Sequence, residues 1–125
     1  MDETLPKSER LSGQMAVSAL FERGKGLSSG CLRCKYILSP AHSDAPVSRI
    51  VVSVPKRLFK RAVKRNLLKR RIREAYRHQK GLLSAPADIL FIYTAPEVLP
   101  YEVIYADMTA LLLALNPLTQ SNLQT

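Results

Sequence analysis

Apolar residues recur along this chain with the spacing of amphipathic helices in three segments. Residues 13–24, 58–80 and 101–116 carry apolar side chains three or four positions apart. Gly81 follows the second segment and Pro117 follows the third, and both residue types favour a helix end. The pattern therefore predicts three helices, the first of them short.

Three shorter apolar runs predict strands. They cover residues 31–40, 49–54 and 88–94, and proline or polar turn residues separate them from their neighbours. The first two follow each other across a loop, so we expect a hairpin or a meander. The third, DILFIYT, is apolar at nearly every position, which is typical of a buried central strand.

Together these elements predict an α+β fold. Their order is α-β-β-α-β-α, in which helices cover a small mixed sheet. The chain has 125 residues and 46% hydrophobic side chains, so we expect one domain over residues 1–125 with a single core. Its ends, residues 1–9 and 117–125, are mostly polar and are expected to be flexible.

Charge is distributed unevenly along the sequence. The formal net charge is +9 and the pI is about 9.9. Twelve of the nineteen Lys and Arg residues lie between Lys56 and Lys80, and none follows Lys80. This clustering predicts one positive surface that binds a polyanion, and nucleic acid is the leading class of partner.

The predicted helix over 58–80 combines an apolar stripe with this charge. Leu68, Ile72, Ala75 and Tyr76 fall within an arc of about 100°, so we expect them to anchor the helix. With the two residues before it, the segment has seven like-charged pairs four positions apart. These would cost roughly 1.5–3.5 kcal/mol if nothing screened them, and phosphates would supply the counter-charge.

The cations and one amide of this segment form the predicted binding surface. Arg61 and Arg65 extend the apolar stripe toward the helix start, so we expect the first turns to overhang the sheet. Asn66 could read a base edge or a 2′-hydroxyl, because its amide both donates and accepts. The predicted nucleic-acid-binding residues are Arg57, Lys60, Arg61, Lys64, Arg65, Asn66, Lys69, Arg70, Arg73 and Arg77.

Other interpretations of the charged segment stay open at this point. A charge run can simply be a solvated surface. A DNA-binding regulator would usually show a helix-turn-helix or a dimer with defined spacing, and neither is evident. Folded RNA offers phosphates in irregular shapes and suits a wide patch better, and a ribosomal or ribosome-associated RNA binder would satisfy the same charge argument.

Other candidate chemistry is sparse. Cys31 and Cys34 have the C-x-x-C spacing, but His42 and His78 are the only histidines that could complete a zinc site. We interpret the cysteines as strand-packing residues. The acids show none of the pairing that two-metal catalysis needs, so we expect no catalytic residue in the protein.

The start of the chain, MDETLPKSER, lacks the basic and apolar succession of a secretory signal. No apolar run approaches the eighteen or so residues that span a bilayer. We therefore expect a cytoplasmic protein that does not use the membrane and whose thiols are reduced.

Four segments resemble the protein component of bacterial ribonuclease P. They are LPKSERL at 5–11, ALFERGK at 19–25, SVPKR at 53–57 and AVKRNLLKRRIREAY at 62–76. The resemblance covers roughly residues 5–115 in the same order, and its most specific part lies in the basic helix.

The resemblance implies a small α+β protein that joins a catalytic RNA, one protein per RNA, to form an endoribonuclease. That enzyme removes the 5′ leader of precursor tRNA. The RNA would carry the chemistry, with Mg²⁺ at the RNA subunit and none bound by protein side chains alone. DNA is not an implied partner. The resemblance also implies a left-handed βαβ crossover, whereas the general rule favours a right-handed one.

The resemblance also assigns roles to residues. Arg65, Asn66, Lys69, Arg70 and Arg73 match an arginine- and asparagine-rich motif that would lie against the catalytic RNA. A cleft between the basic helix and the sheet would hold the single-stranded leader, and it maps onto Phe21, Tyr36, Ser53 and Lys56. Leu67 stands where the family has arginine, outside the arc predicted to face RNA, so that contact is not carried over.

Overall fold

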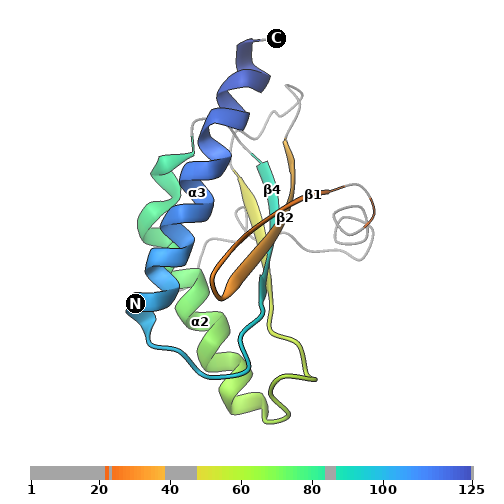
Figure 1. Ribbon diagram of the computed structural model, residues 1–125, viewed down its shortest axis with the longest axis vertical. Helices are drawn as coiled ribbons and strands as arrows, with labels where there is room; N and C mark the ends of the chain where they lie inside the picture. The colour runs from red at the N-terminus through yellow and green to blue at the C-terminus, as the bar shows by residue number, and fades with distance from the viewer. Residues whose placement is uncertain (1–21, 23, 39–47, 84–86, 125) are drawn as a thin grey trace.

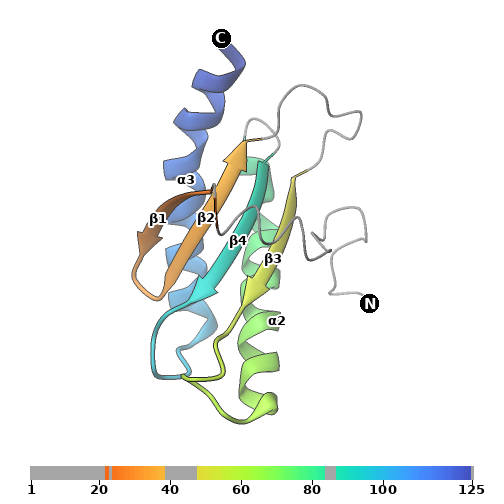
Figure 2. The same cartoon turned by 90° about the vertical axis from the view of Figure 1, so that its right-hand side faces the viewer.

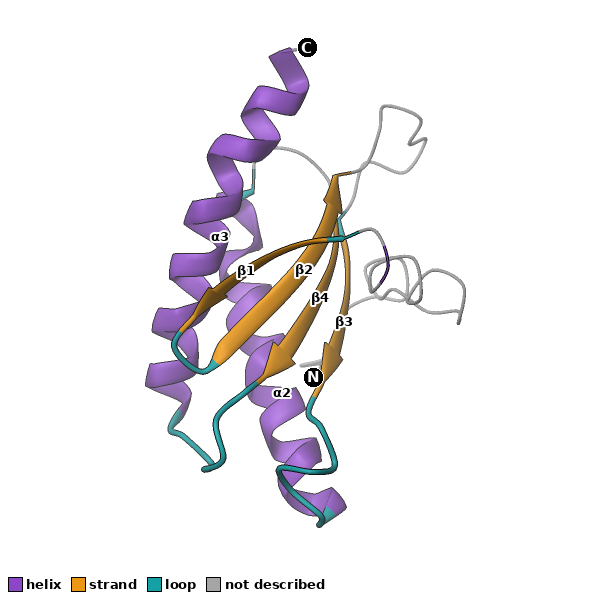
Figure 3. Ribbon diagram, turned by 45° about the vertical axis from the view of Figure 1, so that its right-hand side comes forward, coloured by secondary structure: helices purple, strands orange, loops and turns teal. Residues whose placement is uncertain are grey.

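The protein is an α+β structure in which two long helices cover one face of a four-stranded sheet (Figures 1 and 3). The computed structural model describes residues 22, 24–38, 48–83 and 87–124. Its elements are β1 (Lys25–Ser29), β2 (Leu32–Leu38), β3 (Arg49–Ser53), α2 (Ala62–Gln79), η2 (Lys80–Leu82), β4 (Ala87–Tyr93) and α3 (Tyr101–Gln124). The predicted fold class is confirmed, while the predicted helix over 13–24 falls largely outside the described residues.

β4 lies inside the sheet, between β2 and β3. The strand order is β1-β2-β4-β3, with β3 and β4 parallel and the other two pairings antiparallel. The predicted pairing of β2 with β3 is therefore wrong, whereas the central place of β4 is confirmed. β4 takes this place because it is the most apolar strand, with five of its seven residues buried.

The chain passes from β3 to β4 through α2, and this crossover is left-handed. In Figure 2 the sheet faces the viewer, β3 and β4 both point downward, β4 lies to the left of β3, and α2 runs upward behind them. The handedness that the resemblance implied is therefore present, against the general preference. It places α2 behind the β3 side of the sheet and α3 behind the β1 side (Figure 2).

β1 is a strand that the apolar pattern did not predict. Its sequence, KGLSS, has one large apolar residue, Leu27, because β1 lies at the edge of the sheet. A two-residue turn, Gly30-Cys31, joins Ser29 to Leu32. Gly30 has a φ of 56°, which a type II′ turn requires at its first central position. The Ser-Gly pair before the predicted strand was the signal for this hairpin.

α3 fixes the turn between β1 and β2. The backbone N–H of Cys31 donates to Asp107 Oδ2 at 2.9 Å. A Cβ atom on Gly30 would be strained by the positive φ and would displace the Asp107 carboxylate that it overlaps. The hairpin is thus tied to the helix layer by a side chain as well as by packing.

The core lies between the sheet and the helices. Ile104, Met108, Leu111 and Leu115 of α3 are each at most 1% exposed, as their spacing predicts for one buried stripe. The strand residues that face the helices are Leu32, Cys34, Tyr36, Ile50, Val52, Ala87, Ile89, Phe91 and Tyr93.

α2 begins four residues later than predicted, at Ala62. The reason is Phe59, which is 6% exposed and packs against the ring of Tyr93 with centroids 5.9 Å apart. The N–H groups of Leu58 and Phe59 both bond the carbonyl of Pro55, which forms a turn before the helix. Several of the predicted cations therefore lie in this loop and not on the helix.

The C-terminal ends of α2 and α3 differ from their predicted positions by different amounts. α2 ends at Gln79 and passes into η2, which contains Gly81, so the predicted stop is correct within about a turn. α3 continues to Gln124, past Pro117, where we expected it to end. The proline removes one intrahelical hydrogen bond, and this loss does not terminate α3.

Candidate nucleic-acid interface

α2 is anchored in its later turns and projects beyond the sheet in its first turns. Leu68, Ile72, Ala75 and Tyr76 are each at most 1% exposed, which confirms the predicted anchoring stripe. None of residues 62–67 is buried. Figures 1 and 2 show these turns extending past the ends of β3 and β4, so the predicted overhang is confirmed.

Most of the predicted binding side chains have no partner within the described part of the protein. Those without a hydrogen bond or ion pair there are Arg57, Lys60, Arg61, Lys64, Asn66, Lys69 and Arg70. All are exposed except Lys69, which is half-buried. The first turn of α2 contains no acid, and its free N–H groups add to the positive potential. This surface therefore needs an external counter-charge.

Arg65 has a second role that the sequence did not reveal. Its Nη1 donates to the carbonyl oxygens of Phe59 and Lys60, both at 2.8 Å. These bonds hold the loop against the start of α2. Arg65 thus shapes the loop that carries Lys60 and Arg61, in addition to contributing charge.

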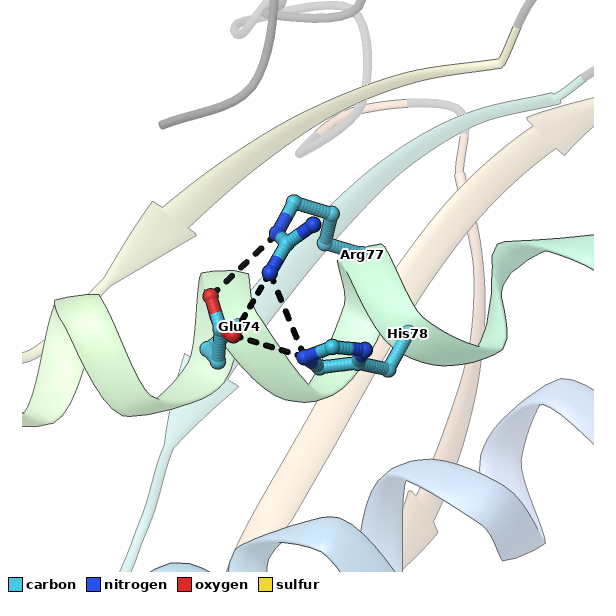
Figure 4. Close-up of polar contacts among 3 residues, drawn as sticks. All are labelled: Glu74, Arg77 and His78. Atoms are coloured by element: carbon cyan, nitrogen blue, oxygen red, sulfur yellow. Dashed lines mark hydrogen bonds and ion pairs between the residues drawn. The ribbon is translucent and has the colours of Figure 1, made fainter. Parts of the chain in front are cut away.

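Arg77 differs from the unpaired cations because an acid on the same helix binds it. Arg77 Nη2 lies 2.7 Å from Glu74 Oε2, and His78 Nε2 lies 2.7 Å from the same oxygen (Figure 4). The hydrogen bonds from Arg77, and secondarily from His78, hold the pKa of Glu74 below its ordinary value. Arg73 also has an interaction inside the protein. The positive surface is therefore strongest toward the start of α2.

Arg71 serves the fold. Its Nη1 donates to the carbonyl of Leu99 at 2.6 Å, in the segment that joins β4 to α3. The hydroxyl of Tyr93 pins the same segment, because it donates to the Glu97 carbonyl at 2.6 Å and accepts from the Leu99 N–H at 3.1 Å. These bonds fix α2 relative to the start of α3.

The residues that the resemblance mapped to a leader cleft do not share one surface. Tyr36 pairs with Ile89 on the face that the helices cover, and it is 6% exposed, so its mapping to an open cleft is corrected. Ser53 pairs with Ile92 on the opposite face. Lys56 lies exposed in the loop before α2, and Phe21 lies outside the described residues.

The opposite face of the sheet, called here the second face, mixes cations with apolar side chains. Its residues are Arg33, Lys35, Ile37, Arg49, Val51, Ser53, Asp88, Leu90 and Ile92. Arg49 is neutralised by Asp88 through a bidentate ion pair with its closest atoms 2.8 Å apart. Arg33 is exposed and has no partner among the described residues. The alternation of cations and apolar residues in LRCKYIL was the sequence signal for this face.

The two cysteines are packing residues, as predicted. Both thiols are free and buried. Burial and a hydrogen bond to Asp107 raise the pKa of Cys31 to about 12, and burial raises that of Cys34 to about 11. Both therefore stay protonated and unreactive at neutral pH.

Two kinds of site are missing from the part of the chain that the structure describes. No three or more His, Cys, Asp and Glu side chains gather there as ligands for a metal ion. Neither long helix combines the length and apolarity that a bilayer crossing requires.

A sequence model of the Ribonuclease P family matches residues 5–116, which include every described strand, α2 and most of α3. The chain belongs to this family. The matched residues include the exposed cations of α2 and of the loop before it, so the candidate interface lies inside the family match.

Curated relatives agree with this assignment. The Ribonuclease P protein component of Porphyromonas gingivalis is 46% identical over 80 residues, which are 64% of this chain and 58% of that protein. The component of Chlorobaculum tepidum is 43% identical over 82 residues, which are 64% and 53% of the two chains. The matched part thus spans little more than half the length of these relatives.

Solved structures share the fold. The RNase P protein of Staphylococcus aureus superposes with a TM-score of 0.72 at 22% identity and covers 85% of this chain and 94% of its own. The RNase P protein of Thermotoga maritima gives a TM-score of 0.70 at 25% identity and covers 83% and 94%. The four-stranded sheet with its two helices is therefore a ribonuclease P protein fold.

Proposed function

We propose that this chain is the protein subunit of ribonuclease P, which binds a catalytic RNA and assists removal of the 5′ leader of precursor tRNA. The observation that carries the proposal is the set of exposed cations on α2 and its loop that have no acid partner in the described protein. Family membership supports the assignment of this surface to ribonuclease P rather than to another RNA-binding protein.

The protein contributes charge and position to this reaction. Cations on α2 offset the repulsion between two RNA chains, because each neutralised phosphate releases condensed counter-ions. The buried stripe anchors the later turns of α2, so the cations there need little ordering on binding. In this proposal the catalytic RNA carries the chemistry and holds the Mg²⁺ that the reaction needs.

The second face is the better place for the leader. It presents Arg33 to solvent, Ser53 at its edge and half-buried Ile37, Val51 and Ile92 between them. Cations bind the backbone of a single strand, while apolar side chains contact its bases. A substrate with a leader would gain these contacts, and a mature tRNA would not.

Reconstitution tests the proposal. The full-length protein, added to its cognate catalytic RNA at a magnesium concentration where the RNA alone is slow, should accelerate leader removal. Lys64→Ala should reduce this stimulation, whereas Lys25→Ala, an exposed lysine on the edge strand β1 with the same change in charge, should have little effect. Absence of stimulation by the wild-type protein would refute the function.

The role of the second face has its own measurement. The assembled enzyme should bind precursor tRNA more tightly than mature tRNA, and Arg33→Ala should reduce that ratio. An unchanged ratio would show that the leader lies elsewhere, even if reconstitution succeeds.

A further inference from the structure

One hollow on the outer side of α2 differs in chemistry from its surroundings. It is shallow and largely open to solvent, with a volume of about 470 Å³, and it is lined by Val63, Asn66, Leu67 and Arg70. These residues are spaced i, i+3, i+4 and i+7, which places them on one stripe of the helix. Leu67 therefore lies beside Asn66 and Arg70, at the border of the surface predicted to face RNA.

The walls of the hollow combine apolar and polar groups. Val63 is 79% exposed and Leu67 is half-buried, so α2 presents apolar surface amid its cations. Asn66 and Arg70 are exposed and have no hydrogen-bond partner among the described residues. A bare phosphate would use Arg70 but would gain nothing from the two apolar walls.

We propose that this hollow receives one unpaired nucleobase of the catalytic RNA; the proposal rests on the function given above. A nucleobase has apolar faces for Val63 and Leu67 and a polar edge that an amide can both donate to and accept from. Its attached phosphate provides the anion for Arg70, whose planar guanidinium binds phosphate in a bidentate manner or stacks on a base. The surrounding cations continue the surface that docks the RNA backbone.

Replacement of Leu67 tests the hollow against simple electrostatics. Leu67→Ala removes an apolar wall without changing charge, so affinity for the catalytic RNA should fall roughly 5- to 30-fold, as expected when a leucine loses the apolar surface that it buries against a base. The dependence of affinity on salt should be unchanged. Leu113→Ala is the matched control, because Leu113 is 50% exposed on α3 and should leave affinity unchanged.

Leu67→Arg distinguishes an interface that binds only phosphates from one that also binds a base, because the two predict opposite changes in affinity. If α2 binds only phosphates, the added cation should tighten binding and steepen its salt dependence. If a base packs against Leu67, the variant loses that apolar contact, so it should bind more weakly than wild type at high salt, where the added charge is screened. Circular dichroism and thermal unfolding of each variant confirm that the fold is retained.

A double-mutant cycle identifies the occupant. A photocrosslinker at Val63 maps the nearest nucleotide, and an abasic site is then made there. With a base in the hollow, Leu67→Ala and the abasic site together should weaken binding no more than either alone. Additive effects would overturn the proposal, and so would wild-type affinity of Leu67→Ala. A different oligomeric state of Leu67→Ala in sedimentation would also overturn it, because the apolar side chains would then contact a second copy of the protein. If Leu67→Ala is coupled to an abasic site in precursor tRNA instead, the base in the hollow does not belong to the catalytic RNA.

These outcomes are separate from failure of the proposed function. A protein that stimulates cleavage yet tolerates Leu67→Ala retains its function and loses only the base site. A protein that fails to bind the catalytic RNA at all refutes both.

Discussion

At the residue scale, Glu74 sets where the positive surface of α2 ends. It is the single acid between Lys56 and Arg77, and its carboxylate accepts from both Arg77 and His78 (Figure 4). Arg77 was predicted to face RNA from its charge and its place on the helical wheel, and neither shows which side chains meet. The i, i+3 spacing of Glu74 and Arg77 was a sequence signal for the pair.

Glu74 should make stability depend on pH in the acid range. Because its pKa is lowered in the folded protein from an ordinary value of 4.5, its contribution is present above that value and is lost as pH falls through the folded pKa. Glu74→Gln should therefore lower the free energy of unfolding by about 0.5–1 kcal/mol at neutral pH, since the pair is partly exposed.

Urea denaturation of both proteins at several pH values measures this effect. The difference in stability between wild type and Glu74→Gln should vanish once the carboxyl is protonated in both states. A difference that persists at low pH would mean that the side chain acts through packing and not through its charge.

At the element scale, the β1–β2 hairpin depends on one glycine. Gly30 has a positive φ and lies against Asp107, which also accepts the Cys31 N–H. The turn therefore connects the sheet edge to α3.

Gly30→Ala should destabilise the protein by at least about 1–2 kcal/mol, the cost of a left-handed conformation for an L-residue, with the overlap with Asp107 in addition. Chemical denaturation measures the loss. Gly81→Ala is the control, because a Cβ at Gly81 meets nothing within 4 Å. Equal effects of the two substitutions would contradict the structural account of the turn.

Helices and strands differ in how far the sequence predicts them. Helical spacing identified Leu68, Ile72, Ala75 and Tyr76 as buried, because periodicity within one helix is local information. Strand order is not local, so the insertion of β4 between β2 and β3 was missed. The face on which Tyr36 lies follows from its pairing with β4, and a shift of one residue would have reversed it.

At the scale of the whole molecule, charge is separated from the core. The anchoring stripe of α2 faces the sheet, while its unpaired cations and those of the preceding loop project from the other sides. Fold stability and RNA affinity can therefore be altered independently at many positions.

Salt dependence should reveal this separation. Affinity for the catalytic RNA should fall steeply with salt, and Lys64→Ala should reduce the slope of log K against log salt by roughly 0.7–0.9, as for loss of one phosphate contact. Filter binding over a salt series measures the slope, and thermal unfolding should show unchanged stability. An affinity that does not change with salt would contradict an electrostatic interface.

The overhang of α2 also links folding to assembly. Residues 62–67 contribute no buried side chain, so the helix backbone and the loop bonds of Arg65 must keep these two turns in place until RNA arrives. Part of the binding free energy is then spent on restraining these first two turns of α2. A variant in which these turns were more rigid before binding would therefore bind the same RNA more tightly without any added contact.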